Sequence, residues 1–556
     1  LGNNERDNAW MDEGLNTYIE IRYMQEKYPN GYKRKKDSSK NETRSITINI
    51  PLEEKQMQSI GYQFNASRNL DQPLQMGSQN FTSFNYAGMI YSKTGLGFHY
   101  LKAYLGEELF DSAMNEYFDK WKFKHPSPSD IQETFEKRSK KDLTWFFDGF
   151  IKTCQKTDYS IKKVKHINDK QYLIKIKNHT GFASPIPVQG ININENSTLI
   201  LKERWLDGFK KDTSIVYNIS SKPSHFSIDH ELITTDFNYY HHLSKSDGPF
   251  KFKKPVKIKF IPFDISNNEV NHIYWAPLLA WNVYDRIMPG LALYNKGIKT
   301  KKTEWLVSPF YSFKNNSING FGEINHYKNS NSFIKRIEFG YKIKSFSSRF
   351  ENLPEYNNRW IKNELYTEIR FKSKNLRSSP FQNILLRAIQ TVEESHIILP
   401  FLIHPPKIEK QKQTTYYGQL KYKLESKQIL KPKSLSINYT YGFNKTNVLS
   451  SLQLTAQFRK NYNFDNDGFE ARIFAGYNFV NKGQNLLYNF NLKGQGSYGN
   501  DSTAINTDYL YDYNFLGRNK YSPHFLGQQM TNTYGAFKIN TSNNAGNILI
   551  GSNFKL

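Results

Sequence analysis

A strict alternation of apolar and polar residues runs through the second half of the chain and limits the folds that it can adopt. From about 270 onward, segments of about ten residues place apolar side chains on one face and polar side chains on the other. The clearest examples are 435–443, 452–459, 469–479 and 488–498. Many of these segments end in Tyr or Phe. The pattern predicts about a dozen antiparallel strands.

Strands of this length, period and aromatic ending are typical of outer-membrane β-barrels. A soluble β-sandwich, whose strands are usually shorter, is the alternative. We therefore predict a long antiparallel β-barrel over residues 249–556, with outer membrane lipid as its partner and the bacterial outer membrane as its location. The final residues, Asn553 to Leu556, lack a terminal aromatic residue, so we expect the barrel to be incomplete at that end.

The composition excludes two other classes of protein. Mean hydropathy is −0.70, and no apolar run of about eighteen residues occurs, which excludes a transmembrane helix in this sequence. The single cysteine, Cys154, excludes an intrachain disulfide framework.

The net charge of +25 is large. A basic surface in solvent is the simpler explanation, and contact with anionic lipid or lipopolysaccharide is the second. The densest basic clusters, 33–36 and 299–302, both fall in predicted loops. No zinc knuckle, RNA-binding sheet signature or helix-turn-helix accompanies them, so we expect no nucleic acid partner.

Residues 1–155 are predicted to be mostly helical, and residues 156–248 to form a small β-sandwich. Apolar residues recur at helical spacing within 86–105 and 109–121, and Ser127 to Asp130 is a typical helix start. Short strand signals with Asn, Gly or Pro turns between them follow. They lie at 159–161, 172–176, 186–188, 198–201, 214–217 and 224–229. We therefore predict a multidomain protein with a helical part, a sandwich and a barrel, in that order.

The stretch 10–20 carries the first indication of function. Leu15 and Tyr18 belong to an apolar stripe at helical spacing, which Gly14 interrupts. Gly lowers helix stability by roughly 1 kcal/mol relative to Ala, so its presence indicates the close approach of another group. Together with Glu13, the stretch resembles the W-x-x-E-G-x-x-x-Y helix of the aminopeptidase-N-type zinc metallopeptidases, which belong to the gluzincins.

Further landmarks of that family follow in the expected order. The segment from Tyr91 to Gly95 resembles its Y-x-K-G motif, although Thr94 stands where the family has Gly. Residues 104–110 resemble its L-G-E-x-x-F continuation, and 125–130 and 142–147 resemble its next two landmarks. The resemblance therefore extends over the whole predicted helical part.

The resemblance implies a catalytic zinc ion and gives roles to two residues. Glu13 would be the third protein ligand of the zinc, and Tyr91 would donate a hydrogen bond to the oxyanion of the tetrahedral intermediate. A zinc-polarised carbonyl develops negative charge on its oxygen, and a phenol hydroxyl stabilises that charge in a dry site. Tyr86 is a candidate for a second hydroxyl.

The other two zinc ligands of the family come from an HExxH helix, which we expect to lie upstream of Leu1. The nearest substitute, 230–234, ends in Thr, so it cannot place two histidines on one helical face. The remaining histidines show no ligand spacing and are interpreted as structural or exposed. They include His99, His166, His241 and His242. This chain alone would supply one ligand, so we expect it to be inactive by itself.

By resemblance, we predict a zinc-dependent, aminopeptidase-like enzyme that hydrolyses peptides, tethered to the outer membrane with its peptidase part in the periplasm. The family's G-x-M-E-N substrate-amine motif does not occur, so exopeptidase and endopeptidase action both stay open. The alternative is an outer-membrane transport or binding protein with a degenerate peptidase-like domain. Neither the peptide specificity nor the oligomeric state follows from the sequence.

Overall fold

The chain divides into two compact units in a computed structural model. The first comprises 1–257, 262–272 and 297–301, and the second comprises 258–261, 273–296 and 302–556. The structure describes residues 2–28, 53–194, 197–248, 254–260, 270–282, 284–297, 300–330, 332–349, 357–377, 379–398, 408–426, 428, 431–462, 467–483, 488–492, 508–512, 534–536 and 544–555. The basic cluster 33–36 and part of 299–302 lie outside the described residues.

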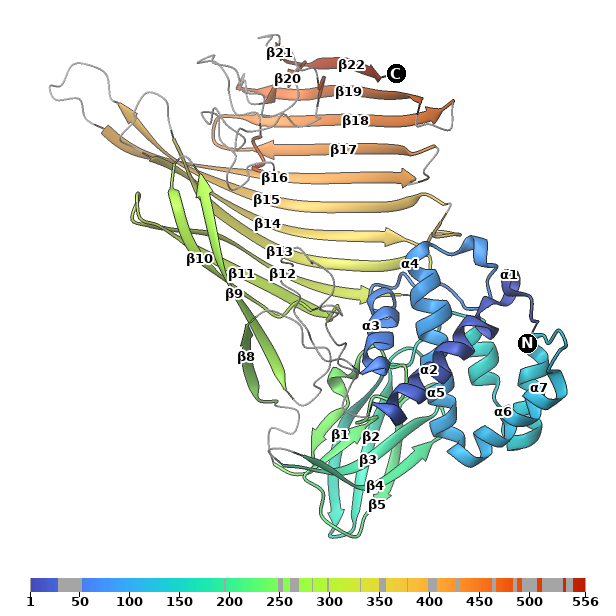
Figure 1. Cartoon of the computed structure of the whole chain (residues 1–556). Helices are drawn as coiled ribbons and strands as arrows, with labels where there is room; N and C mark the ends of the chain where they lie inside the picture. Colours follow the sequence, from blue (N-terminus) through green and yellow to red (C-terminus); the bar gives the residue numbers. More distant parts are fainter. Residues whose placement is uncertain are drawn as a thin grey trace, which may run out of the picture. The chain divides into compact units, whose positions relative to one another are not determined.

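The first unit opens with a helical part (Figure 1), as predicted for residues 1–155. Its α-helices are α1 (Glu5–Asn8), α2 (Glu13–Lys27), α3 (Glu54–Ala66), α4 (Ser83–Asn85), α5 (Thr94–Leu105), α6 (Glu107–Trp121) and α7 (Pro128–Ser139). Short 3-10 turns are η1 (Ala9–Met11) and η2 (Ser78–Asn80), and π-helices are η3 (Tyr86–Lys93) and η4 (Trp145–Ile151).

Two predicted helix boundaries are confirmed. Helix α5 ends at Gly106, whose φ of +89° is a conformation that favours glycine. Helix α7 begins with a capping box formed by Ser127 and Asp130, with Pro128 in the first turn. The single helix expected over 86–105 is instead η3 followed by α5, because apolar periodicity does not separate a π-helical turn from an α-helical one.

The predicted strand signals of residues 156–248 are also confirmed. One sheet has the order β1-β2-β5, and the other has the order β4-β3-β6-β7. The strands are β1 (Tyr159–Asn168), β2 (Gln171–Asn178), β3 (Ile186–Ile193), β4 (Thr198–Leu206), β5 (Thr213–Asn218), β6 (His225–Ile228) and β7 (Leu243–Lys245). A 3-10 turn, η5 (Tyr239–His241), precedes β7. The two sheets share one core that includes Tyr172, Ile174, Val188 and Phe226.

The sandwich packs on helix α5 within the first unit. The hydroxyl of Tyr100 donates to the backbone oxygen of Pro185, and that of Tyr104 donates to Asp207 at 2.9 Å. The ring centroids of Tyr104 and Trp205 lie 5.6 Å apart. The small sheets therefore brace the helical part.

A 13-stranded sheet makes up most of the second unit, in the order β22-β19-β18-β17-β16-β15-β14-β13-β12-β11-β10-β9-β8. Its strands follow one another side by side (Figure 1). They are β8 (Val256–Phe260), β9 (Asn271–Asn282), β10 (Arg286–Tyr294), β11 (Thr303–Ser312), β12 (Ser317–Asn329), β13 (Ile334–Arg349), β14 (Asn357–Phe371), β15 (Phe381–Ile398), β16 (Ile408–Ser426), β17 (Lys433–Phe443), β18 (Val448–Asn461), β19 (Gly468–Lys482) and β22 (Ile548–Lys555).

The predicted closure into a barrel is not supported. The sheet ends in β8 on one side and β22 on the other, and among the described residues these two edge strands do not pair. Alternation fixes the face that each side chain occupies, whereas closure depends on strand tilt and stagger, which the alternation does not encode. The strand expected over 488–498 is described only to 492, where β20 (Phe490–Asn491) pairs with β21 (Asn544–Ala545).

The alternation itself is confirmed. Unusually, the apolar face of the sheet is the more exposed one and the polar face is the more buried one. On β17, Ile437 is 36% exposed and Phe443 is 46% exposed, whereas Thr440 on the opposite face is fully buried. No helix among the described residues has the length and hydropathy needed to cross a bilayer.

Candidate functional site

Helix α2 and the π-helix η3 lie in contact at Gly14. A Cβ atom placed on Gly14 would lie 2.3 Å from Cγ2 of Thr94 and 2.9 Å from the backbone oxygen of Ile90. No larger residue fits there without moving one of the two helices. The close approach inferred from the sequence is therefore confirmed, and Thr94, at the start of α5, is the group that fills the space.

This contact brings Glu13 and Tyr91 together. Burial raises the pKa of the Tyr91 phenol, and a hydrogen bond with the Glu13 carboxylate raises it further. Both side chains are half-buried. The resemblance implied a role for each residue without placing them in contact, and the structure adds this contact.

The π-helix explains the position of Tyr86. In a π-helix the backbone bonds join residues five apart, so Tyr86 and Tyr91 lie one above the other. Their ring centroids are 6.0 Å apart with the planes at 65°. Burial and then the charge of Glu13 raise the pKa of Tyr86. The ring of Tyr86, the second candidate, therefore lies beside that of Tyr91.

The surroundings of Glu13 are acidic. A hydrogen bond with Asp12 and the charge of that residue raise the pKa of the exposed Glu5, and the charge of Glu13 adds to this. Carboxylates that crowd in this way favour a cation. The cluster therefore attracts positive charge to the end of α2 where Glu13 lies.

Lys93 holds η3 in place, a role that the sequence did not reveal. Its fully buried ammonium donates to the backbone oxygens of Phe150 at 2.7 Å and Thr153 at 3.3 Å. Burial lowers its pKa to about 8. The sequence feature that could have indicated this role is the lysine of the Y-x-K motif, because a lysine is rarely buried without a specific partner.

The described residues do not complete a zinc site. Catalytic zinc takes three protein ligands, and no group of three His, Cys, Asp or Glu side chains in the described part of the chain is arranged to hold a metal ion. Glu13 offers one carboxylate, and its neighbours Glu5 and Asp12 interact with each other. These residues alone therefore do not supply enough ligands to hold a zinc ion.

The histidines interpreted as structural or exposed form no metal-binding group with Glu13 in the described part of the chain. His242 is buried in the sandwich, where its Nε2 lies 3.0 Å from Oδ2 of Asp236. Burial lowers the pKa of His99, on α5, to about 3. His230 follows β6 outside any helix, so the 230–234 stretch has no helical face for ligands.

A comparison with known protein families agrees with the resemblance over the helical part. Residues 2–150 match the family model described as the Peptidase family M1 domain. Among solved structures, a crystal structure of Legionella pneumophila aminopeptidase A in complex with aspartic acid matches with 16% identity and a TM-score of 0.29, over 41% of this chain and 24% of that chain. The match thus spans about a quarter of that protein. No curated protein sequence matches.

Proposed function

We propose that the helical part supplies Glu13 and Tyr91 to the active site of a zinc-dependent, aminopeptidase-like peptidase. The contact between these two side chains, in a segment that matches the M1 peptidase domain, is the observation that carries the proposal. Glu13 would provide one zinc ligand. Because the described residues do not complete the metal site, no catalytic step through the ion is derived from them.

The chain's own contribution to the chemistry is a positioned hydrogen-bond donor. A phenol is protonated at neutral pH, so Tyr91 can donate to an oxygen on which negative charge develops. Helices α2, η3 and α5 fix the distance between this donor and Glu13 through the contact of Gly14 with Thr94 and Ile90. Tyr86 is close enough to Tyr91 to contact the same substrate group.

Substitution of Tyr91 tests the role of the donor. In the natural gene product, with any sequence encoded on either side of 1–556, Tyr91→Phe should lower kcat for peptide hydrolysis by about 10²–10³. Zinc content, measured by mass spectrometry of the metal, should stay unchanged. Tyr104→Phe is the matched control, since its phenol bonds to Asp207 on the sandwich side of α5. Equal kcat values for wild type and Tyr91→Phe would remove this role.

A binding or transport protein with a degenerate peptidase-like part is the second candidate. It is favoured by the lack of a group of three metal-binding side chains in the described ranges. The natural gene product used in the Tyr91 experiment also separates the two candidate functions. A natural gene product without zinc and without hydrolysis of any peptide would support the second candidate and exclude the first.

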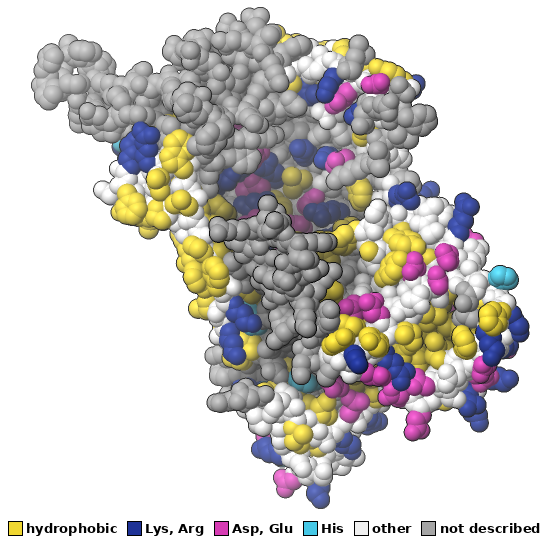
Figure 2. Space-filling view, viewed as in Figure 1, with side chains coloured by type: hydrophobic (Ala, Val, Ile, Leu, Met, Phe, Trp, Pro, Cys, Tyr) yellow, Lys and Arg dark blue, Asp and Glu magenta, His cyan; other side chains and the backbone are white. Residues whose placement is uncertain are grey.

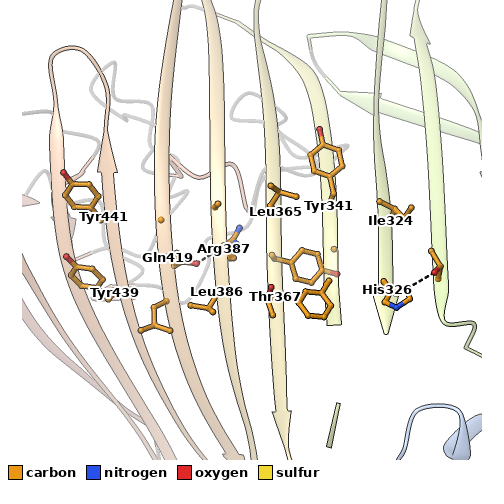
Figure 3. A pocket seen from close by; sticks show the side chains of 17 residues that line it. Ile324, His326, Tyr341, Leu365, Thr367, Leu386, Arg387, Gln419, Tyr439 and Tyr441 are labelled. Carbon is orange, nitrogen blue, oxygen red and sulfur yellow. Dashed lines mark hydrogen bonds between the residues drawn. The ribbon is translucent and has the colours of Figure 1, made fainter. Parts of the chain in front are cut away.

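We also propose that the apolar face of the long sheet lies in the lipid of a bacterial outer membrane. On this face Leu365 is 61% exposed, and Leu386 and Tyr439 are exposed beside it. Figure 3 shows Leu365, Leu386, Tyr439 and Tyr441 along neighbouring strands, where they line a cavity of about 810 Å³.

The opposite face supports this proposal because it is polar yet more buried. The side chain of Arg387 is 9% exposed and that of Lys362 is 7% exposed. A soluble sheet buries its apolar face and exposes its polar face. The reverse arrangement is typical of strands that face lipid. By this proposal the helical part would lie in the periplasm.

A further inference from the structure

A charged cavity opens on the polar face of strands β12 to β15. Figure 2 shows basic and acidic side chains gathered in a hollow of the molecule. The cavity measures about 470 Å³. Charged side chains line it, among them Glu323, Glu338, Lys344, Lys362, Glu364 and Arg387. Strand register places these side chains on one face, since Glu323 is opposite Lys342, and Lys342 is opposite Glu364.

One wall of this cavity is a completed ion-pair network. Arg387 donates to Glu364 at 2.7 Å and to Asp512 at 2.9 Å, and Lys362 lies 3.0 Å from Glu364. The side chains of Arg387, Lys362 and Glu364 are at most 9% exposed. Buried charges that pair in this way hold one another in fixed positions. The network therefore forms a rigid wall with its charges satisfied.

Two lysines of the cavity, Lys342 and Lys344, form no hydrogen bond or ion pair with another described residue. The ammonium of Lys342 lies 4.4 Å from the ring centroid of Tyr366, whereas Lys344 is half-buried without such a contact. Its cross-strand neighbour is a second cation, Lys362, whose own charge is taken up by Glu364 and Asp512. The carboxylates of Asp512, Asp508 and Glu364 act on Lys344 electrostatically, but none of them pairs with it, and burying an unpaired ammonium beside another cation is unfavourable. Lys344 therefore marks a position for an anionic group.

Carboxylates at the other end of the cavity retain acceptor capacity. Glu323 forms an ion pair with Lys296, and Glu338 accepts a hydrogen bond from Tyr366 at 2.7 Å and lies 3.5 Å from Arg370. An ionised carboxylate has about four lone-pair sites, so each can accept a further donor. A simple anion in the cavity would be repelled by these carboxylates. A ligand that also carries an ammonium group at this end would instead be attracted to them.

The spacing of the two ends limits the ligand. Glu323 is directly opposite Lys342, so it is the diagonal neighbour of Lys344. Diagonal neighbours in an antiparallel pair lie roughly 7–8 Å apart. An extended peptide spans about 3.3–3.6 Å per residue, so the ends of a dipeptide are separated by about 7 Å.

We propose that this cavity binds a short peptide with free ends, of dipeptide size, with its carboxylate at Lys344 and its amino group at Glu323. The site stands on the geometry of the sheet and does not depend on the peptidase assignment. Products of peptide hydrolysis belong to the same chemical class.

Calorimetric titration of the detergent-solubilised chain with alanyl-alanine tests the proposal. The free dipeptide should bind, and Lys344→Met and Glu323→Gln should each weaken it by about tenfold or more, the loss expected for one charge-assisted contact. Alanyl-alanine amide should bind weakly, and Lys344→Met should not change its affinity. N-acetyl-alanyl-alanine should bind weakly and be insensitive to Glu323→Gln. Lys421→Met is the control, because Lys421 is a half-buried lysine on the same polar face outside the cavity.

A conservative variant and a measurement of folding separate loss of binding from loss of folding. Lys344→Arg keeps the charge and should bind the dipeptide within about threefold of wild type, and circular dichroism compares the folding of all variants. The proposal is overturned if wild type does not bind the dipeptide, if Lys344→Met binds it as wild type does, or if capped and free dipeptides bind equally. Inorganic phosphate that binds as tightly as the dipeptide would also overturn it, since the site would then be a simple anion site.

Discussion

At the scale of single residues, Gly14 shows how one missing side chain sets the geometry of the candidate site. The backbone oxygen of Ile90 in η3 lies 2.9 Å from the position that a Cβ atom would take, and backbone cannot rotate away as the end of a flexible side chain can. The separation of α2 and η3, and with it the contact between Glu13 and Tyr91, therefore depends on glycine at this position.

Gly14→Ala should destabilise the first unit. Alanine favours a helix by roughly 1 kcal/mol over glycine, but overpacking costs about 1–3 kcal/mol, and contact with the Ile90 backbone puts this site at the upper end. We expect the thermal unfolding midpoint to fall by a few degrees. Gly418→Ala is the control, because a Cβ there has no atom within 4 Å. A midpoint at or above that of wild type would show that the helices can separate freely.

Tyr159 gives the first unit a stability that depends on pH. Burial raises the pKa of its phenol to about 12, and its hydroxyl donates within a cage of the backbone oxygens of Phe182 and Ser184. Because the folded pKa lies above the unfolded value near 10, this stability is complete below pH 10 and is lost as pH rises toward 12. Tyr159→Phe should therefore cost more at pH 8 than at pH 11.5, with a difference of about 2 kcal/mol. Urea unfolding at the two pH values measures it, and an equal cost at both would contradict the assignment.

At the scale of elements, the sequence predicted some features and not others for identifiable physical reasons. The end of α5 at Gly106 and the start of α7 at Ser127 were predictable, because capping is a local property of a few residues. The π-helix η3 was not, since its apolar period is close to that of an α-helix. Motif resemblance named Glu13 and Tyr91, whereas the burial of Lys93 against Phe150 depends on a distant segment.

Strand β17 offers a direct test of the sheet's two faces. Ile437 lies on the exposed apolar face, and a charge on a lipid face costs roughly 2–4 kcal/mol near the bilayer midplane. Ile437→Arg should therefore reduce membrane assembly of the natural gene product, measured in the membrane fraction. Asn438→Asp is the control, because Asn438 lies on the opposite face, across from Lys421, and gives it a partner. Recovery of the folded wild-type protein in the soluble fraction without detergent would contradict the lipid-facing proposal.

At the scale of the whole molecule, the alternation predicted an antiparallel sheet of the right extent but not the state of its edges. Strands β8 and β22 are edge strands, and unpaired backbone groups are costly in hydrocarbon. A lipid-facing sheet therefore requires partners for these strands, which the described residues do not supply. The peptidase proposal has a parallel requirement, since Glu13 needs further ligands to hold zinc.

The central claim is that Glu13 belongs to a zinc peptidase site, and the metal content of the natural gene product tests it most directly. We predict about one zinc ion per chain in the wild type, and loss of both zinc and peptide hydrolysis in Glu13→Gln, since removal of a ligand weakens metal binding. Glu20→Gln, an exposed position on the same helix, should keep both. Stoichiometric zinc in Glu13→Gln, with activity retained, would contradict the account.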